Sequence, residues 1–242
     1  MRSLALGEVE IFEVATTDER CLRRSVDYLS ILCDRERRRH DAFHFERDRH
    51  LYRVSHALLR QCLAQYHDIP PADWRFEEGT FGRPEIVARS GCPPLRFSLS
   101  HTHGLAACAV TLEMDIGLDV EAIDRDIDVA SVAEHVFSVQ ERQCLAACGG
   151  SEQRDLFFRY WTLKEAYIKA VGAGMTLPLQ SISFQNVAGG EPRIDFEDAI
   201  DDLPDRWRFW QSRPLNGNLH RMALAIASGP VRPAVTTFDH VP

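Results

Sequence analysis

The sequence predicts an α+β protein made of two similar halves. Two segments, 46–63 and 152–171, read as long helices, and each is followed by short strands separated by Gly and Pro turns. Because the order of elements repeats, we expect an N-terminal half of residues 1–115 and a C-terminal half of residues 116–242. The two halves would form a pseudo-dimer within one chain, with a ligand cleft between them.

The strands of each half are expected shortly after its helix. In the first half they fall within residues 74–86 and 95–112, and in the second half within residues 182–194 and 207–227. Both sets contain Gly or Pro where a turn between neighbouring strands is needed.

Composition indicates an ordinary globular protein in a reducing compartment. The chain has 242 residues, of which 45% are hydrophobic and 26% charged. Its seven cysteines form no CxxC pair, which argues against a disulfide framework. No apolar run approaches the roughly 20 residues that span a bilayer, and acids follow the first residues too closely for a signal peptide. We expect a cytoplasmic protein with no membrane partner.

The charge is negative overall and uneven along the chain. A formal net charge of −8 argues against a general nucleic-acid binder. Residues 20–60, however, contain 11 arginines against 6 acids. This excess is either a solvated helix face or a surface that attracts an anionic ligand or an acidic protein partner.

Lysine is used at only two positions, Lys164 and Lys169, although Lys and Arg together number 28. Both lie in the segment 161–169, on either side of Glu165. A lysine is a compact ammonium whose pKa can fall on desolvation, whereas arginine is a planar fork that stays charged. Either an Arg-biased genome left two lysines by chance, or this segment needs the chemistry of lysine. We favour the second interpretation.

Two carboxylates share one face of a predicted strand. Residues 105–121 read as a hairpin, and in its second strand Asp119 and Glu121 alternate with apolar residues. Side chains two residues apart on a strand can converge on one point, and oxygen ligands suit Mg²⁺. The alternative is a polar face exposed to water.

The segment 155–171 predicts a buried helix that carries polar groups. Glu165 falls one turn after Trp161, and Lys169 one turn after Glu165. Aromatic residues bracket them, and a Gly-Ala-Gly run at 172–174 ends the helix. We expect Glu165 and both lysines to project from it.

A third polar element is the strand and turn at residues 97–104. Its hydroxyls, His101 and backbone N–H groups could hold a phosphate. The pair of His101 and His103 could instead suggest zinc, but no third His or Cys lies at ligand spacing.

Three motifs together resemble the Sfp-type 4′-phosphopantetheinyl transferases. They are Ser-Leu-Ser-His-Thr at 98–102, Gly-Leu-Asp-Val-Glu at 117–121, and Trp-Thr-Leu-Lys-Glu-Ala-Tyr-Ile-Lys at 161–169. The resemblance continues through Phe-Gly-Arg-Pro at 81–84 and Gly-Ala-Gly-Met-Thr-Leu-Pro at 172–178, so it covers most of the chain.

The resemblance implies transfer of the phosphopantetheine arm of coenzyme A to a serine of an acyl, peptidyl or aryl carrier protein, with release of 3′,5′-ADP. By similarity, Asp119, Glu121 and Glu165 would hold Mg²⁺, and Glu165 would also be the candidate base for the carrier serine, directly or through a water. Lys169, and with it Lys164, would meet the pyrophosphate.

The remaining residues that the resemblance implies are Arg83, Ser100 and His101, which would line the nucleotide end of coenzyme A. Arg83 stands where Lys is common in the family. The N-terminal arginines that contact coenzyme A in the family cannot be placed, because Arg39, Arg49 and Arg53 all suit the role.

Two other functions compete with this interpretation. A Mg²⁺-dependent nucleotide phosphohydrolase could use the same acids with water as the nucleophile. A catalytically silent carrier-binding protein would be expected to lack one of the acids or Lys169, and none is missing. Because one chain supplies both halves of the expected cleft, we predict a monomer.

Overall fold

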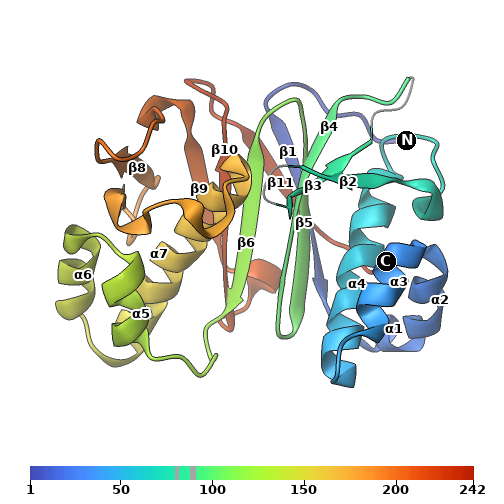
Figure 1. Cartoon of the computed structure of the whole chain (residues 1–242), viewed down its shortest axis with the longest axis horizontal. Helices are drawn as coiled ribbons and strands as arrows, with labels where there is room; N and C mark the ends of the chain where they lie inside the picture. The colour runs from blue at the N-terminus through green and yellow to red at the C-terminus, as the bar shows by residue number, and fades with distance from the viewer. Residues whose placement is uncertain (80–81, 88–90) are drawn as a thin grey trace. The chain divides into compact units, whose positions relative to one another are not determined.

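The computed structural model describes residues 1–79, 82–87 and 91–242 (Figure 1). It consists of two compact units: Met1–Met114 with Pro233–Pro242, and Asp115–Arg232. The described part of the chain contains no helix long and apolar enough to cross a membrane.

The first unit is built on a four-stranded sheet in the order β11-β1-β5-β4. Its strands are β1 (Glu8–Ala15), β4 (Leu95–Thr102), β5 (Leu105–Leu112) and β11 (Ala234–Asp239). The long helix α4 (Glu46–Leu63) lies against this sheet (Figure 1), and its ends match the prediction. The predicted boundary places the last ten residues in the second half, but β11 pairs in parallel with β1 and so belongs to the first unit.

Smaller elements complete the first unit. Its other helices are α1 (Glu19–Arg23), α2 (Ser25–Ile31), α3 (Asp34–Asp41) and the 3-10 turn η1 (Pro71–Asp73). A hairpin joins β2 (Phe76–Glu78) to β3 (Pro84–Ile86). The apolar face of α4 and the inner face of the sheet form one core, which includes Phe12, Leu58, Trp74 and Val110.

The second unit is built on a three-stranded antiparallel sheet in the order β6-β10-β9. Its main strands are β6 (Ile116–Ala122), β9 (Arg208–Ser212) and β10 (His220–Ile226), and β7 (Ile182–Gln185) pairs with β8 (Arg193–Phe196). Its helices are α5 (Val129–Val136), α6 (Val139–Ala146) and α7 (Gly150–Val171). Four 3-10 turns lie at Gly174–Thr176, Leu179–Ser181, Pro204–Arg206 and Pro214–Asn216.

Each unit follows the same chain order: a strand, short helices, a long helix, a hairpin and two further sheet strands. In both, the first strand pairs antiparallel with the strand that ends this series, β1 with β5 and β6 with β10. The predicted α+β class is confirmed, while the pseudo-dimer and its cleft stay predictions.

The helix α7 packs directly on the backbone of β6 at Gly117. A Cβ at this position would lie 1.9 Å from the carbonyl oxygen of Ala166 and 2.5 Å from the backbone nitrogen of Ala170. Only glycine allows two backbones to come this close. The face of β6 that carries Asp119 and Glu121 is therefore covered by a helix, and the alternative of a polar face exposed to water does not hold.

A buried ion pair fixes α3 to α4 in the first unit. Arg60 is fully buried, and its Nε donates to Oε2 of Glu36 at 2.9 Å. Burial alone would raise the pKa of Glu36, but the hydrogen bond with His56 and the charges of His56 and Arg60 lower it to about 2. Carboxylate and guanidinium thus stay charged inside the unit, where removal of one partner would leave the other unpaired.

We predict that Gly117→Ala lowers the free energy of unfolding by about 3 kcal/mol or more, because the added methyl group meets backbone atoms that cannot rotate away. Urea denaturation measures this. Gly189→Ala is the matched control, since a Cβ there meets nothing within 4 Å. Equal stability of the two variants would contradict the close approach.

We predict that Glu36→Gln is more destabilising at neutral than at acid pH. The folded pKa of Glu36 lies below its ordinary 4.5, so its stabilisation is complete above pH 4.5 and is lost as the pH falls toward 2. The loss in the variant should be about 3 kcal/mol at pH 7 and about 2 kcal/mol at pH 3.5. Urea denaturation at both pH values tests this, and an equal loss at both would refute it.

Candidate active site

The contact between β6 and α7 brings together four of the predicted site residues. Strand β6 supplies Asp119 and Glu121, and helix α7 supplies Glu165 and Lys169. Lys169 Nζ donates to Oδ1 of Asp119 at 2.7 Å, and the Asp119 side chain is only 6% exposed. A contact between residues 50 positions apart shows that the second and third sequence motifs meet in one place.

Glu121 is held by two groups that the sequence analysis did not assign. The indole nitrogen of Trp161 donates to its Oε1 at 3.0 Å. Arg125 Nη1 lies 2.7 Å from both carboxylate oxygens. Arg125 lies four residues after Glu121, a spacing that predicts a contact only within a helix. Because Arg125 lies in the loop that follows β6, its contact with Glu121 could not be predicted from the sequence.

The three acids act on one another electrostatically. The pKa of Glu165 is raised to about 7, chiefly by burial and next by the charge of Asp119, against the lowering effect of Lys169. Burial and the charge of Asp119 also raise the pKa of Glu121, which the hydrogen bond from Arg125 opposes. Such mutual effects need carboxylates that are close together.

A concentration of carboxylates suits a hard divalent cation, whose charge would offset their repulsion. As they stand, no three His, Cys, Asp or Glu side chains among the described residues form a group that could hold a metal ion. Asp119 and Glu121 instead each contact a cation of the chain itself, Lys169 and Arg125. The carboxylate oxygens therefore fit Mg²⁺ as donors. Two of the expected ligands, Asp119 and Glu121, are in contact with the cationic side chains of Lys169 and Arg125.

Lys164 does not join this site, contrary to the prediction that it contacts the ligand and projects from the helix. Its side chain is 1% exposed and its Nζ lies 2.8 Å from Oε2 of Glu141. The same ammonium donates to the carbonyl oxygens of Leu179 and Ile182. With these acceptors and no exposure to water, Lys164 ties α7 to neighbouring segments rather than meeting a phosphate.

The partner of Lys164 was also missed from the sequence, although a signal was present. Ser138 and Glu141 have the spacing of a helix capping box, and in the structure each side chain pairs with the backbone of the other. Glu141 additionally accepts from the backbone nitrogen of Phe184 at 3.0 Å. This carboxylate thus fixes the start of α6 and the first residues of β7 to α7.

The predicted nucleotide-binding residues lie in the first unit, on and near β4. Ser100 is buried and His101 exposed on that strand, opposite Ala107 and Ala106 of β5. The turn motif at 81–84 is described only in part, because Phe81 lies outside the described residues. Since the structure describes each unit separately, the role of these residues stays a prediction.

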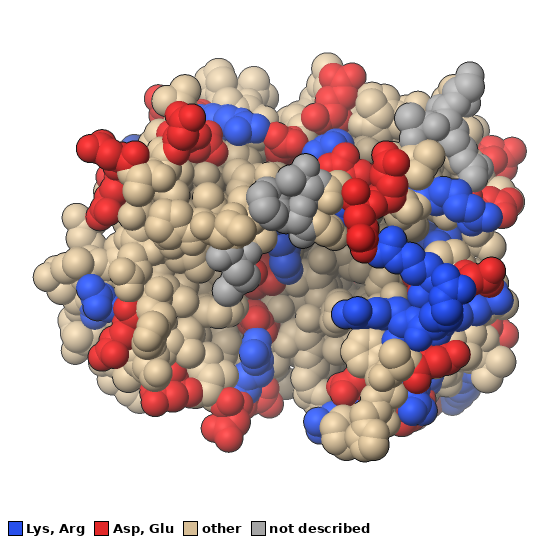
Figure 2. Space-filling model, in the orientation of Figure 1, with Lys and Arg blue, Asp and Glu red and all other residues tan. Residues whose placement is uncertain are grey.

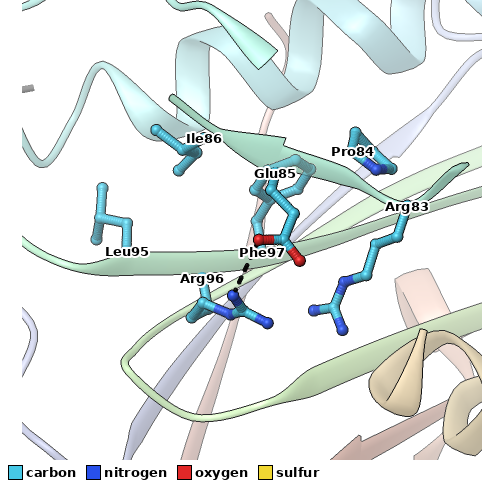
Figure 3. Close-up of a pocket in the computed structure, with 7 residues that line it drawn as sticks. All are labelled: Arg83, Pro84, Glu85, Ile86, Leu95, Arg96 and Phe97. Atoms are coloured by element: carbon cyan, nitrogen blue, oxygen red, sulfur yellow. Dashed lines mark hydrogen bonds and ion pairs between the residues drawn. The ribbon is translucent and has the colours of Figure 1, made fainter. Parts of the chain in front are cut away.

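Arg83 lines a pocket of about 50 Å³ in the first unit (Figure 3). Its guanidinium group and that of Arg96 point toward the same space, with the carboxylate of Glu85 beside them. Arg96 lies 3.4 Å from Glu85. A small pocket with two guanidinium groups is suited to part of an anionic ligand.

The surface over α3 is rich in arginine. On the face shown in Figure 2, basic side chains gather over the region of α3 and α4. The exposed arginines of α3 are Arg35, Arg37, Arg38 and Arg39. Part of the arginine excess of residues 20–60 therefore lies on the surface of the first unit.

Two family profiles match the chain. One, for the 4′-phosphopantetheinyl transferase superfamily, matches residues 115–227, and the other, for the N-terminal part of a 4′-phosphopantetheinyl transferase, matches residues 23–113. A holo-(acyl-carrier-protein) synthase from Bacillus anthracis, solved in complex with CoA (3′,5′-ADP), aligns at 21% identity with a TM-score of 0.38, covering 46% of this chain and 93% of that one.

Curated relatives carry the same name as the profiles. The 4′-phosphopantetheinyl transferase HetI of Nostoc is 34% identical over 149 residues, covering 62% of this chain and 63% of HetI. Sfp of Bacillus subtilis is 28% identical, covering 71% of this chain and 74% of Sfp. A further 4′-phosphopantetheinyl transferase of B. subtilis is 31% identical, covering 64% and 67%. The chain thus spans just under two thirds of HetI. Because it covers two thirds of the relative that is 31% identical, and both profiles agree, the chain belongs to the 4′-phosphopantetheinyl transferase superfamily.

Proposed function

We propose that this member of the superfamily transfers the 4′-phosphopantetheine arm of coenzyme A to a serine of an apo acyl, peptidyl or aryl carrier protein, releasing 3′,5′-ADP. The observation that carries the proposal is the contact of Lys169 with Asp119 beside Glu121 and Glu165. This contact places carboxylates and a cation close together, and phosphoryl-type transfer needs both kinds of group. They belong to two of the motifs that carry the family resemblance.

In this proposal the carrier serine is the nucleophile. Its Oγ attacks the phosphorus that bears the pantetheine arm, and the bond from that phosphorus to the bridging oxygen breaks, so that 3′,5′-ADP leaves with the bond electrons. The serine proton passes to Glu165, directly or through a water. Burial is the main cause of the raised pKa of Glu165 in the metal-free site. A bound Mg²⁺ would lower that pKa and hold Glu165 as the carboxylate, the form that accepts a proton.

Asp119, Glu121 and Glu165 would hold Mg²⁺. When bound, that ion would neutralise pyrophosphate charge and help to orient the phosphates. Lys169 is 32% exposed and lies at the edge of the acid cluster, where its ammonium can contact the pyrophosphate and stabilise charge on the leaving group. Coenzyme A is the co-substrate of this proposal, and Arg83, Ser100 and His101 are its proposed contacts at the nucleotide end.

Further features support the setting of the reaction. The exposed arginines of α3 would attract an acidic carrier. The seven cysteines are all free, which supports a reducing compartment such as the cytoplasm. The alternative of a Mg²⁺-dependent phosphohydrolase gains no support, because the curated relatives described above are named as transferases.

Intact mass spectrometry of an apo carrier protein incubated with this protein, Mg²⁺ and coenzyme A tests the proposal. We predict a mass gain of one phosphopantetheine arm that is lost with EDTA.

Asp119→Asn should slow the reaction about 100-fold or more, because it removes a carboxylate from the acid cluster. Lys169→Arg should slow it about tenfold, because a planar guanidinium cannot take the position of a compact ammonium.

Asp198→Asn is the matched control, since Asp198 is exposed in the same unit and lies outside the acid cluster. It should react at the rate of the wild type. Hydrolysis of coenzyme A with no gain on any of several carriers would refute the transferase. An unchanged rate in Asp119→Asn would remove that residue from the site.

A further inference from the structure

Arg125 has an unusual position at one of the proposed metal ligands. A single nitrogen, Nη1, is 2.7 Å from each oxygen of Glu121, so it lies between the two oxygens. A cation that binds a carboxylate through both oxygens takes this same position. The guanidinium of Arg125 would therefore compete with a divalent cation for the oxygens of Glu121.

Arg125 and Trp161, which both contact Glu121, differ in how easily they can leave. Arg125 lies in the loop after β6, and its side chain is 48% exposed against 11% for Glu121. On release its charge returns to water at little cost. Trp161 lies on α7, donates to one oxygen only, and its ring stacks on that of Phe157. Trp161 can keep its hydrogen bond after Arg125 has left, because a carboxylate oxygen accepts more than one partner.

We propose that Arg125 is an internal counter-ion that competes with the divalent cation for Glu121, while Trp161 holds the carboxylate in a fixed orientation in both states. The proposal rests on the metal assignment of the proposed function and adds a regulatory element to it. Arg125 offsets the repulsion among the acids while the site is without metal, and this lowers the affinity for the ion.

Arg125 and Lys169 have separate roles in this account. Lys169 contacts Asp119 from the helix and is the group proposed to meet the pyrophosphate. Arg125 contacts Glu121 from the loop, on the neighbouring acid of the same strand. Removal of Arg125 should therefore strengthen metal binding rather than remove a contact with the substrate.

The test is a Mg²⁺ titration of the full chain without coenzyme A, at constant ionic strength, followed by the indole N–H resonance of Trp161 in ¹H–¹⁵N spectra. This resonance is assigned by its absence in Trp161→Phe. Because the indole donates to Glu121, its shift reports on that carboxylate. The midpoint for Arg125→Gln should be about two- to fivefold lower than for the wild type, the range expected for loss of a half-exposed ion pair.

The matched control is Arg23→Gln. Arg23 makes the same i,i+4 pair with Glu19, at 2.6 Å, on the surface of the first unit. The Mg²⁺ midpoint of Arg23→Gln should equal that of the wild type. Such a result would show that the effect of Arg125→Gln does not come merely from the removal of a positive charge.

An equal or higher midpoint in Arg125→Gln, with an otherwise preserved spectrum, would overturn the proposal. The proposed function would then still stand if the carrier gains its phosphopantetheine arm with Mg²⁺. If the Trp161 resonance of the wild type does not respond to Mg²⁺ at any concentration, Glu121 is not a ligand, and both this proposal and the metal role of Glu121 fail.

Discussion

The close approach of α7 to β6 at Gly117 is the constraint on which the second unit depends. A backbone-to-backbone contact at this position fixes both the distance of the helix from the strand and its register. Strand alternation then places Asp119 and Glu121 on the face that α7 covers. Gly117 lies against Ala166 and Ala170, whereas Glu121, further along the strand, contacts Trp161, which comes earlier in the helix. The strand β6 and the helix α7 therefore run in opposite directions.

Small residues on the neighbouring strand extend this arrangement. In β10, Ala225 pairs with Gly117 and Ala223 with Asp119, and both alanines are fully buried in the core that α7 shares. A large side chain at either alanine would compete for the volume that the helix occupies. Packing and chemistry are therefore linked, because the residues that admit the helix also position the carboxylates.

The two lysines of the chain, both on α7, have different surroundings and different roles. Lys164 is buried with Glu141 and backbone carbonyl acceptors, and desolvation lowers its pKa against the opposing effect of Glu141. Lys169 is partly exposed beside Asp119. A compact ammonium suits both places, whereas a planar guanidinium needs more room and more acceptors. The choice of lysine in this segment thus has a structural reason at one position and a proposed catalytic one at the other.

Much of the fold and part of the site could be predicted from local patterns. The helix at 46–63 and the α+β class could be predicted from periodicity, because periodicity depends on neighbouring residues. The family could be predicted from the resemblance of three motifs to known transferases. The burial of Lys164 could not be predicted, since helical spacing gives a direction but not what packs there. The contact of Arg125 with Glu121 and the return of β11 to the first unit depend on tertiary packing, which short patterns do not encode.

The direct contact of Lys169 with Asp119, made where α7 packs on β6, can be measured by a double-mutant cycle. The free energies of unfolding of the wild type, Asp119→Asn, Lys169→Met and the double variant would be measured by urea denaturation. We predict a coupling energy of about 1 kcal/mol between the two residues. Additive effects, within about 0.3 kcal/mol, would contradict it.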